Sequence, residues 1–255
     1  HYWGVWWGME PFEMYKKKVG RFVSEYGFQG MPDFRTLKKI AADSSLNLNS
    51  VAIKNHQKHP TGYQTIAIYM ARDYKIPKKF EDYIYVSQLL QAKGMKTAIE
   101  AHRRAKPICM GTLYWQLNDC WPVTSWSSVD YYNNWKAAHY QIKRSFAEKI
   151  ISVNETDSAL EIYVINDGMK KIYGRLAVKL LDFAGIVLWK NSNPYELQHI
   201  EANGSQLIST IKKSELKEFD LGKLFLTLDL KLEGDDSEIS SIHYFAKPKN
   251  IPLTK

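Results

Sequence analysis

The spacing of hydrophobic positions changes near residue 145 of this chain. Before that point, short apolar runs alternate with segments in which apolar residues recur every three to four positions. The run at 108–116 (ICMGTLYWQ) predicts a buried strand, whereas residues 81–104 and 131–146 predict helices. Repeated strand-then-helix segments are typical of a parallel sheet covered by helices. We therefore predict an α/β fold for the first part of the chain.

After residue 147 the pattern becomes an alternation of apolar and polar residues, which is typical of half-buried strands. Turn signals such as NDG, EANGS and EGDD divide it into five runs, which lie at 159–167, 175–191, 205–213, 223–234 and 241–249. Short strands at this spacing predict an all-β sandwich of the immunoglobulin type.

The tryptophan distribution marks the same boundary, because seven of the eight tryptophans precede residue 136. The chain has 255 residues, with 45% hydrophobic and 24% charged residues, as expected of a globular protein. We predict an α/β domain at 1–145, a β-sandwich at 146–247 and, because of its two prolines, a linker to a further domain at 248–255.

The formal net charge of +8 raises the question of nucleic-acid binding. The excess belongs to residues 1–145, which hold 21 Lys and Arg against 11 Asp and Glu, while the remainder holds 14 against 16. The basic residues come in scattered pairs such as Lys38 with Lys39 and Arg103 with Arg104. Nucleic-acid binding concentrates charge in one patch, so we interpret these pairs as solvated helix faces and expect no nucleic-acid partner.

Membrane insertion, metal binding and a disulfide framework find little support in the sequence. No apolar run reaches the roughly 18 residues that span a bilayer, and residues 1–10 lack the features of a signal peptide. Cys109 and Cys120 are interpreted as core thiols, although a bond between them stays possible. We expect no cofactor, no metal and no membrane contact, and the compartment stays open.

Candidate chemistry gathers at two aromatic segments. In FVSEYGFQG (22–30), Glu25 stands between a short apolar run and a glycine-containing turn. In the second segment, Trp115 ends the predicted strand, and Asn118 and Asp119 follow in a tryptophan-rich loop. Loops at the carboxyl ends of parallel barrel strands build active sites, and pyranose rings stack on indoles while their hydroxyls need polar partners. Together the two segments indicate sugar binding.

Five segments, in order, resemble the catalytic barrel of β-mannosidases of glycoside hydrolase family 2: HYWGVW (1–6), RFVSEYGFQG (21–30), NHQKHPTG (55–62), YVSQLLQA (85–92) and the tryptophan-rich stretch 110–140. The resemblance implies the end of a (β/α)8 barrel, with about its last three strands, followed by an accessory immunoglobulin-like domain. It also implies a retaining exo-glycosidase that acts on terminal β-mannosyl residues of an oligosaccharide or glycan.

On the SEYGFQ motif, the resemblance implies that Glu25 is the nucleophile; the alternative is a salt-bridged core carboxylate. Trp115 resembles the tryptophan beneath the mannose, unless it is a core residue. Tyr2 or Trp3 resembles the aromatic that orients the nucleophile or lines the sugar site, with ordinary rim packing as the alternative. Asn118 and Asp119 are interpreted as loop organisers, and His56, His59 and His139 as structural residues.

The family's general acid/base, which precedes the nucleophile in an Asn-Glu pair, has no counterpart here. The Asn-Glu pair at Asn154 and Glu155 lies in the β-rich part and is not carried over. We therefore expect the chain to begin inside the barrel, to be inactive alone and to associate with itself through the open barrel edge. If it were active and monomeric, Glu10 or Asp119 would have to supply the second carboxylate.

Two other functions stay open at this point. The barrel could carry another family 2 activity, β-glucuronidase or β-galactosidase, because strands outside this chain contribute to specificity. The chain could also be a non-catalytic carbohydrate-binding module that uses its tryptophans as a platform, although such modules are generally all-β.

Overall fold

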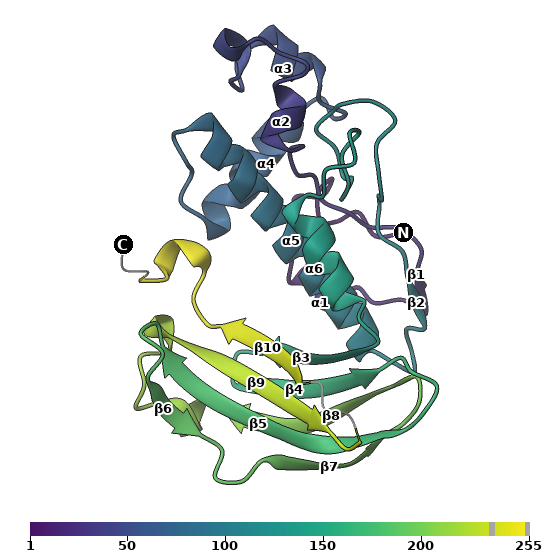
Figure 1. The fold of residues 1–255 in the computed structure, drawn as a ribbon, viewed down its shortest axis with the longest axis vertical. Helices are drawn as coiled ribbons and strands as arrows, with labels where there is room; N and C mark the ends of the chain where they lie inside the picture. The colour runs from purple at the N-terminus through teal and green to yellow at the C-terminus, as the bar shows by residue number, and fades with distance from the viewer. Residues whose placement is uncertain (235–237, 253–255) are drawn as a thin grey trace. The chain divides into compact units, whose positions relative to one another are not determined.

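The computed structural model describes residues 1–234 and 238–252 in two compact units. The first unit comprises residues 1–102 and 108–146, and the second comprises residues 103–107 and the described residues from 147 onward. Each unit has its own elements and is described by itself (Figure 1).

The first unit is mainly helical. Its elements are α1 (Met14–Lys17), α2 (Phe34–Leu37), the 3-10 helix η1 (Asp43–Ser45), α3 (Val51–Asn55), α4 (Gly62–Asp73), α5 (Phe80–Arg104) and α6 (Ala137–Ser145). The last two residues of α5 belong to the second unit. The helix expected at 81–104 is confirmed. The helix expected at 131–146 begins only at Ala137, because the Asp130 carboxylate accepts the backbone N–H groups of Tyr132 and Asn134 and holds a turn there.

Two short strands, β1 (Phe22–Val23) and β2 (Gly111–Thr112), pair in parallel in the first unit. This agrees with the predicted parallel pairing, but the strand expected over 108–116 has only two residues. It is not buried either, since Ile108 is 68% exposed and Trp115 is 45% exposed. β1 is the partner of β2 among the described residues, so apolar side chains near β2 have little to pack against. The three barrel strands remain a prediction.

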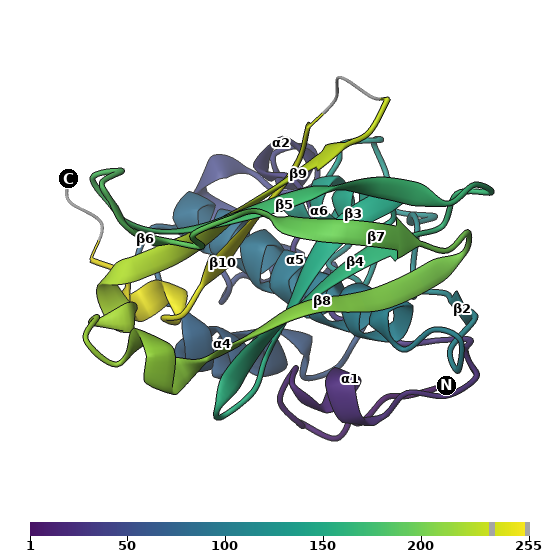
Figure 2. The ribbon, with the colours of Figure 1, turned by 90° about the horizontal axis from the view of Figure 1, so that it is seen from below.

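The second unit consists of two antiparallel sheets. The first contains β3 (Lys149–Glu155), β4 (Ala159–Asn166) and β8 (Gly204–Lys212) in that order. The second has the order β10 (Glu238–Tyr244), β9 (Leu224–Leu232), β5 (Ile172–Asp182) and β6 (Val187–Lys190), with β7 (Tyr195–Ile200) also paired to β5 (Figure 2). The unit also contains short 3-10 helices. η2 (Lys213–Leu216) and η3 (Leu221–Lys223) lie between β8 and β9, and η4 (Pro248–Asn250) follows β10.

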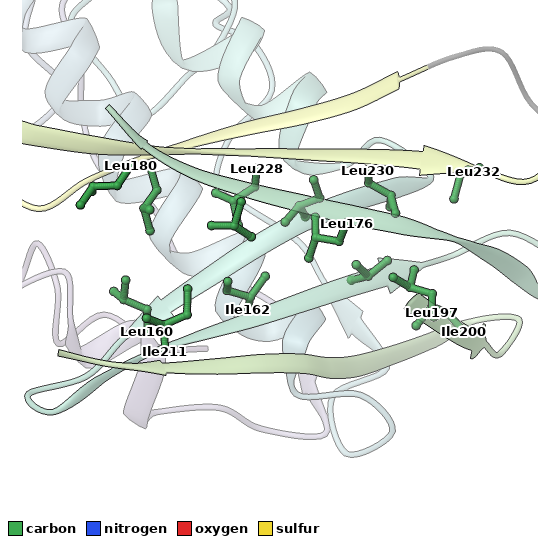
Figure 3. Packing of buried hydrophobic residues seen from close by; sticks show 14 of the residues in the cluster. Leu160, Ile162, Leu176, Leu180, Leu197, Ile200, Ile211, Leu228, Leu230 and Leu232 are labelled. Atoms are coloured by element: carbon green, nitrogen blue, oxygen red, sulfur yellow. The ribbon is translucent and has the colours of Figure 1, made fainter. Parts of the chain in front are cut away.

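Side chains from the two sheets meet in one hydrophobic core, which confirms the predicted sandwich. Along β9, every second residue from Leu224 to Leu232 is buried, and Figure 3 shows the leucines of β5 and β9 facing residues of β4 and β8, including Leu160, Ile162 and Ile211. Full burial of one such side chain stabilises the fold by about 1.5–3 kcal/mol. The alternation of apolar and polar residues along the strands therefore identifies the residues of the core.

The five predicted strand runs are confirmed, with two additions. The run at 175–191 is two strands, β5 and β6, joined by a turn in which Gly185 has a φ of +88°. β3 and β7 were not predicted. Of the expected linker 248–255, η4 occupies the first three residues, and 253–255 lie outside the described residues.

Two expectations about individual residues change with the structure. Cys109 is a buried free thiol as expected, but Cys120 is an exposed free thiol, not a core residue. Arg103 does not lie on a solvated face: it is buried, its guanidinium donates to the Ala147 carbonyl oxygen at 2.8 Å, and it forms an ion pair with Asp167. Among the described helices, none has the length and apolarity needed to cross a membrane.

An ion-pair cluster around Glu155 joins the two sheets. The Glu155 carboxylate lies 2.7 Å from Lys213 Nζ and 3.1 Å from His243 Nε2. Burial raises the pKa of Glu155, but the hydrogen bonds from His243 and Lys213 outweigh burial, so this pKa lies below its usual value of 4.5. A depressed carboxylate pKa contributes stability that is present above pH 4.5 and is lost as the pH falls through the folded-state pKa.

We therefore expect Glu155→Gln to lower the unfolding free energy by about 1 kcal/mol at pH 7 and by less at a pH below the folded-state pKa, where the native carboxylate is protonated. Urea denaturation of the chain at both pH values measures this difference. Glu201→Gln is the matched control, because its pair with Lys171 is exposed and contributes little. If Glu155→Gln lowered the unfolding free energy equally at both pH values, the ionised Glu155 carboxylate would not be the source of this stability.

Candidate active site

Glu25 lies two residues beyond β1, at the carboxyl end of the parallel pair. Its side chain is 26% exposed, whereas Tyr26 and Phe28 directly after it are fully buried. The carboxylate contacts the His1 imidazole, and the backbone carbonyl oxygen of Glu25 accepts the Tyr2 N–H at 2.8 Å. A carboxylate held by a rigid neighbouring backbone but still open to solvent can meet a substrate.

Trp115 lies beside the Glu25 segment because β2 continues next to β1. Its backbone N–H donates to the Tyr26 carbonyl oxygen at 2.7 Å, and its peptide bond to Gln116 is cis. The exposure of the indole does not fit the alternative of a core residue. It leaves a broad apolar surface free next to the carboxylate segment.

Gly27 brings the aromatic residues close to Glu25. A Cβ atom at this position would collide with the Trp115 carbonyl oxygen and would lie 3.2 Å from ring atoms of both Trp3 and Trp126. The rings of Trp3 and Trp126 meet edge to face, with centroids 6.2 Å apart. A glycine two residues after Glu25 therefore lets Trp3 and Trp115 approach the same stretch of backbone.

The backbone and the side chain of Tyr2 have different hydrogen-bond partners. Its backbone contacts Glu25, but its hydroxyl donates to the Glu10 carboxylate, and its ring packs against Tyr15 with centroids 5.8 Å apart. Burial raises the pKa of the Tyr2 phenol, and the hydrogen bond to Glu10 raises it further. Tyr2 is therefore a neutral donor at physiological pH, and its hydroxyl engages Glu10.

The loop after Trp115 is organised by Asp119. Its side chain is buried and accepts hydrogen bonds from Lys58 Nζ at 3.0 Å, from Ser125 Oγ at 2.7 Å and from Ser127 Oγ. This matches the expected role of a loop organiser and leaves Asp119 poorly placed to act on a substrate. The histidines have local partners as well, for example His139 Nδ1 with Ser128 Oγ at 2.9 Å.

The Asn154-Glu155 pair is part of the ion-pair network of the second unit. Asn154 Nδ2 donates to Glu161 at 2.8 Å, and Glu155 binds Lys213 and His243 as described above. These contacts give the pair a structural role in the second unit.

Two buried polar residues near the Glu25 and Trp115 segments were not singled out from the sequence. Gln91 on α5 is 1% exposed and Lys136 is 0% exposed. Burial lowers the pKa of Lys136 to about 8, although the charges of Asp119 and Asp130 oppose this effect. Glutamine on the apolar face of a helix was a signal that could have been noticed in YVSQLLQA. Lys136 has no such signal, because a lysine after Trp135 looks like a surface residue.

The site offers one partly exposed carboxylate, that of Glu25, close to aromatic side chains. Within residues 1–234 and 238–252, no group of three or more His, Cys, Asp or Glu side chains is arranged to hold a metal ion. The arrangement suits attack on, or binding of, a polar ring molecule with apolar faces, which describes a sugar.

Comparisons with known proteins find similarity to β-mannosidases. Residues 158–250 match the family model described as the mannosidase Ig/CBM-like domain. The β-mannosidase of Mus musculus is 34% identical over 173 residues, which cover 63% of this chain and 20% of that protein. The β-mannosidase A of Neosartorya fischeri is 30% identical over 243 residues, which cover 85% of this chain and 26% of that protein.

A solved structure extends the similarity to the fold. The crystal structure of a β-D-mannosidase from Dictyoglomus thermophilum matches 99% of this chain and 31% of its own, with a TM-score of 0.91 and 33% identity. The chain thus spans about a fifth to a quarter of the two curated relatives. The family-model match also bears out the prediction of an immunoglobulin-like domain.

Proposed function

Given that the similarity of this chain to the β-mannosidases of glycoside hydrolase family 2 is confirmed, we propose that it forms part of a retaining exo-β-mannosidase. Glu25 is the nucleophile of that enzyme. The substrate is a terminal β-mannosyl residue on an oligosaccharide or glycan, and the first unit contributes the last strands of a (β/α)8 barrel.

The observation that carries this proposal is the position of Glu25. It is a half-open carboxylate at the carboxyl end of a parallel strand pair, where barrel enzymes place their reacting groups. The Trp3 ring and the Trp115 backbone carbonyl oxygen both lie close to Gly27, two residues away. Trp115 is proposed to lie beneath the sugar, and Tyr2 and Trp3 to line its site.

In the proposed reaction, one Glu25 carboxylate oxygen forms a bond to the anomeric carbon while the bond from that carbon to the leaving oxygen breaks. The leaving oxygen takes a proton from a general acid. Water, deprotonated by the same group, then attacks the anomeric carbon and releases Glu25, so that the configuration is retained. Retaining enzymes hold the two carboxyl groups about 5–5.5 Å apart.

We assign the general acid/base to a part of the intact enzyme outside this chain. Asp119 supports the loop and Glu155 supports the second unit, so neither is free for the role. Glu10, which accepts the Tyr2 hydroxyl, is engaged as well. The chain alone is accordingly proposed to be inactive. Because β1 and β2 pair with each other among the described residues, their outer edges favour self-association.

Aryl glycoside assays and light scattering test the proposal together. We expect the intact enzyme to prefer aryl β-mannoside over the β-glucuronide and β-galactoside. The isolated 255-residue chain should show no turnover and should scatter light as an oligomer. Preference of the intact enzyme for another glycoside would reject the mannoside assignment. If the chain were monomeric and active, the second carboxylate would lie within these residues, and Glu10 would be the first residue to substitute.

The alternative function, a carbohydrate-binding module, predicts a different result. Tight binding of mannobiose by an inactive intact protein would favour it.

A further inference from the structure

The segments that carry Glu25 and Trp115 are joined by few backbone hydrogen bonds beyond β1 and β2. Past the ladder, Gly30 N–H donates to the Ser125 carbonyl oxygen at 3.1 Å, and these two residues form an isolated bridge. The Trp126 carbonyl oxygen accepts the Gln116 N–H at 3.2 Å. The carbonyl groups of Phe28 and Ser127 need partners from elsewhere, because buried carbonyl groups without hydrogen bonds are costly.

Gln91 supplies these partners from α5. Its side-chain Nε2 lies 2.9 Å from the Phe28 carbonyl oxygen, 3.1 Å from that of Trp126 and 3.0 Å from that of Ser127. Three acceptors around one nitrogen fix the orientation of the amide, since the flipped amide would turn its oxygen towards three carbonyl oxygens. One amide group thus binds both segments at once.

Gly30 shows how closely this contact is built. A Cβ atom at Gly30 would collide with the side-chain oxygen of Gln91. Any larger residue there would push the Glu25 segment away from α5. The glycine and the glutamine therefore form one arrangement that sets the distance of the segment from the helix.

Lys136 binds the same two segments from another side. Its Nζ donates to the Gly30 carbonyl oxygen at 2.8 Å, and the Ser125 carbonyl oxygen lies 3.5 Å away. The side chain is fully buried and reaches these atoms from the residue before α6. Two buried donors from different elements thus hold residues 28–30 against residues 125–127.

We propose that Gln91 and Lys136 are positioning residues. They fix the segment that carries Glu25 (residues 22–30) relative to the tryptophan-rich segment that carries Trp115 (residues 110–140). This inference rests on the proposed function of Glu25. Neither residue needs to touch the substrate. Their loss lets the two segments shift, and a displacement of about 1 Å at a reacting group can cost up to about 100-fold in rate. The first chemical step, in which Glu25 attacks, is the step that such a shift slows.

The test uses Gln91→Met and Lys136→Met in the intact enzyme, with the aryl β-glycoside that the wild type hydrolyses best and a dinitrophenyl leaving group that needs little acid assistance. We expect the rate of glycosyl-enzyme formation in stopped-flow measurements to fall by about tenfold or more in each variant, with a smaller change in the hydrolysis of the intermediate. If Gln91→Met does not fold, Gln91→Asn, whose side chain is one methylene shorter, takes its place in the test.

Leu90→Ala is the matched control, because Leu90 is fully buried on the same helix but makes no polar contact to either segment. It should lower the melting temperature at least as much as Gln91→Met while glycosylation stays within twofold of the wild type. The inference is overturned if both positioning variants keep near-native glycosylation rates, or if Leu90→Ala slows glycosylation equally. Failure of the proposed function is seen separately, as wild-type rates in Glu25→Gln.

Discussion

Replacing Glu25 by glutamine should lower the kcat of the intact enzyme by about 10³-fold or more while the protein still folds. The substitution keeps the size of the side chain and removes the anionic oxygen that attacks the anomeric carbon. Because Glu25 is partly exposed and its neighbours Tyr26 and Phe28 form the buried part of the segment, the fold loses little. Circular dichroism and steady-state kinetics on one preparation measure both quantities.

Glu155→Gln is the control for this experiment. It changes a carboxylate of the Asn-Glu pair, and its role in the second unit is electrostatic support. We expect its kcat at neutral pH to equal that of the wild type. A normal kcat in Glu25→Gln would make Glu25 a structural residue, and a large loss in Glu155→Gln would show that the Asn-Glu pair had been wrongly set aside.

Replacing Trp115 by alanine should lower kcat/KM by roughly 10- to 150-fold. This range corresponds to the loss of about 1.5–3 kcal/mol of apolar contact between one large side chain and the sugar face. The half-exposed indole contributes little to folding, so the melting temperature should change by only a few degrees. The loss of activity should therefore greatly exceed the loss of stability.

Trp189→Ala supplies the comparison, since Trp189 packs against the hydrophobic core of the second unit. That substitution should lower the melting temperature and leave kcat/KM within twofold. If Trp115→Ala instead lowered the melting temperature strongly and left kcat/KM unchanged, Trp115 would be a packing residue and the sugar would lie elsewhere.

The β-sandwich was predictable from the sequence because alternation along a strand directly reflects burial on one face. β9 illustrates this, with buried leucines at every second position. β3 and β7 were missed for different reasons. β3 follows α6 without a turn signal. In β7 (YELQHI) the buried residues Leu197 and Ile200 are three positions apart, which breaks the alternation expected of a strand. Pairing with longer strands stabilises both, and sequence patterns do not show such partners.

The first unit was harder to predict because its strands are short and its contacts are between distant segments. The aromatic and acidic residue types suggested a sugar site, and the family resemblance supplied roles for Glu25 and Trp115. The supporting residues could not be found in this way. Gln91 bonds to backbone carbonyl groups 35, 36 and 63 positions away, and Lys136 bonds to carbonyl groups 11 and 106 positions away. Spacing along the sequence does not reveal these contacts, although a glutamine on an apolar helix face indicates a buried polar role.

Trapping the glycosyl-enzyme tests the central claim most directly. A 2-deoxy-2-fluoro-β-mannosyl fluoride slows the second step of a retaining enzyme more than the first, so that the sugar stays attached to the nucleophile. After proteolysis at Arg21 and Arg35, tandem mass spectrometry should find the added fluoromannosyl mass on the peptide 22–35 and, within it, on Glu25. A label on any other residue, or hydrolysis of β-mannosides with inversion and no labelled peptide, would contradict the assignment of Glu25 as the nucleophile.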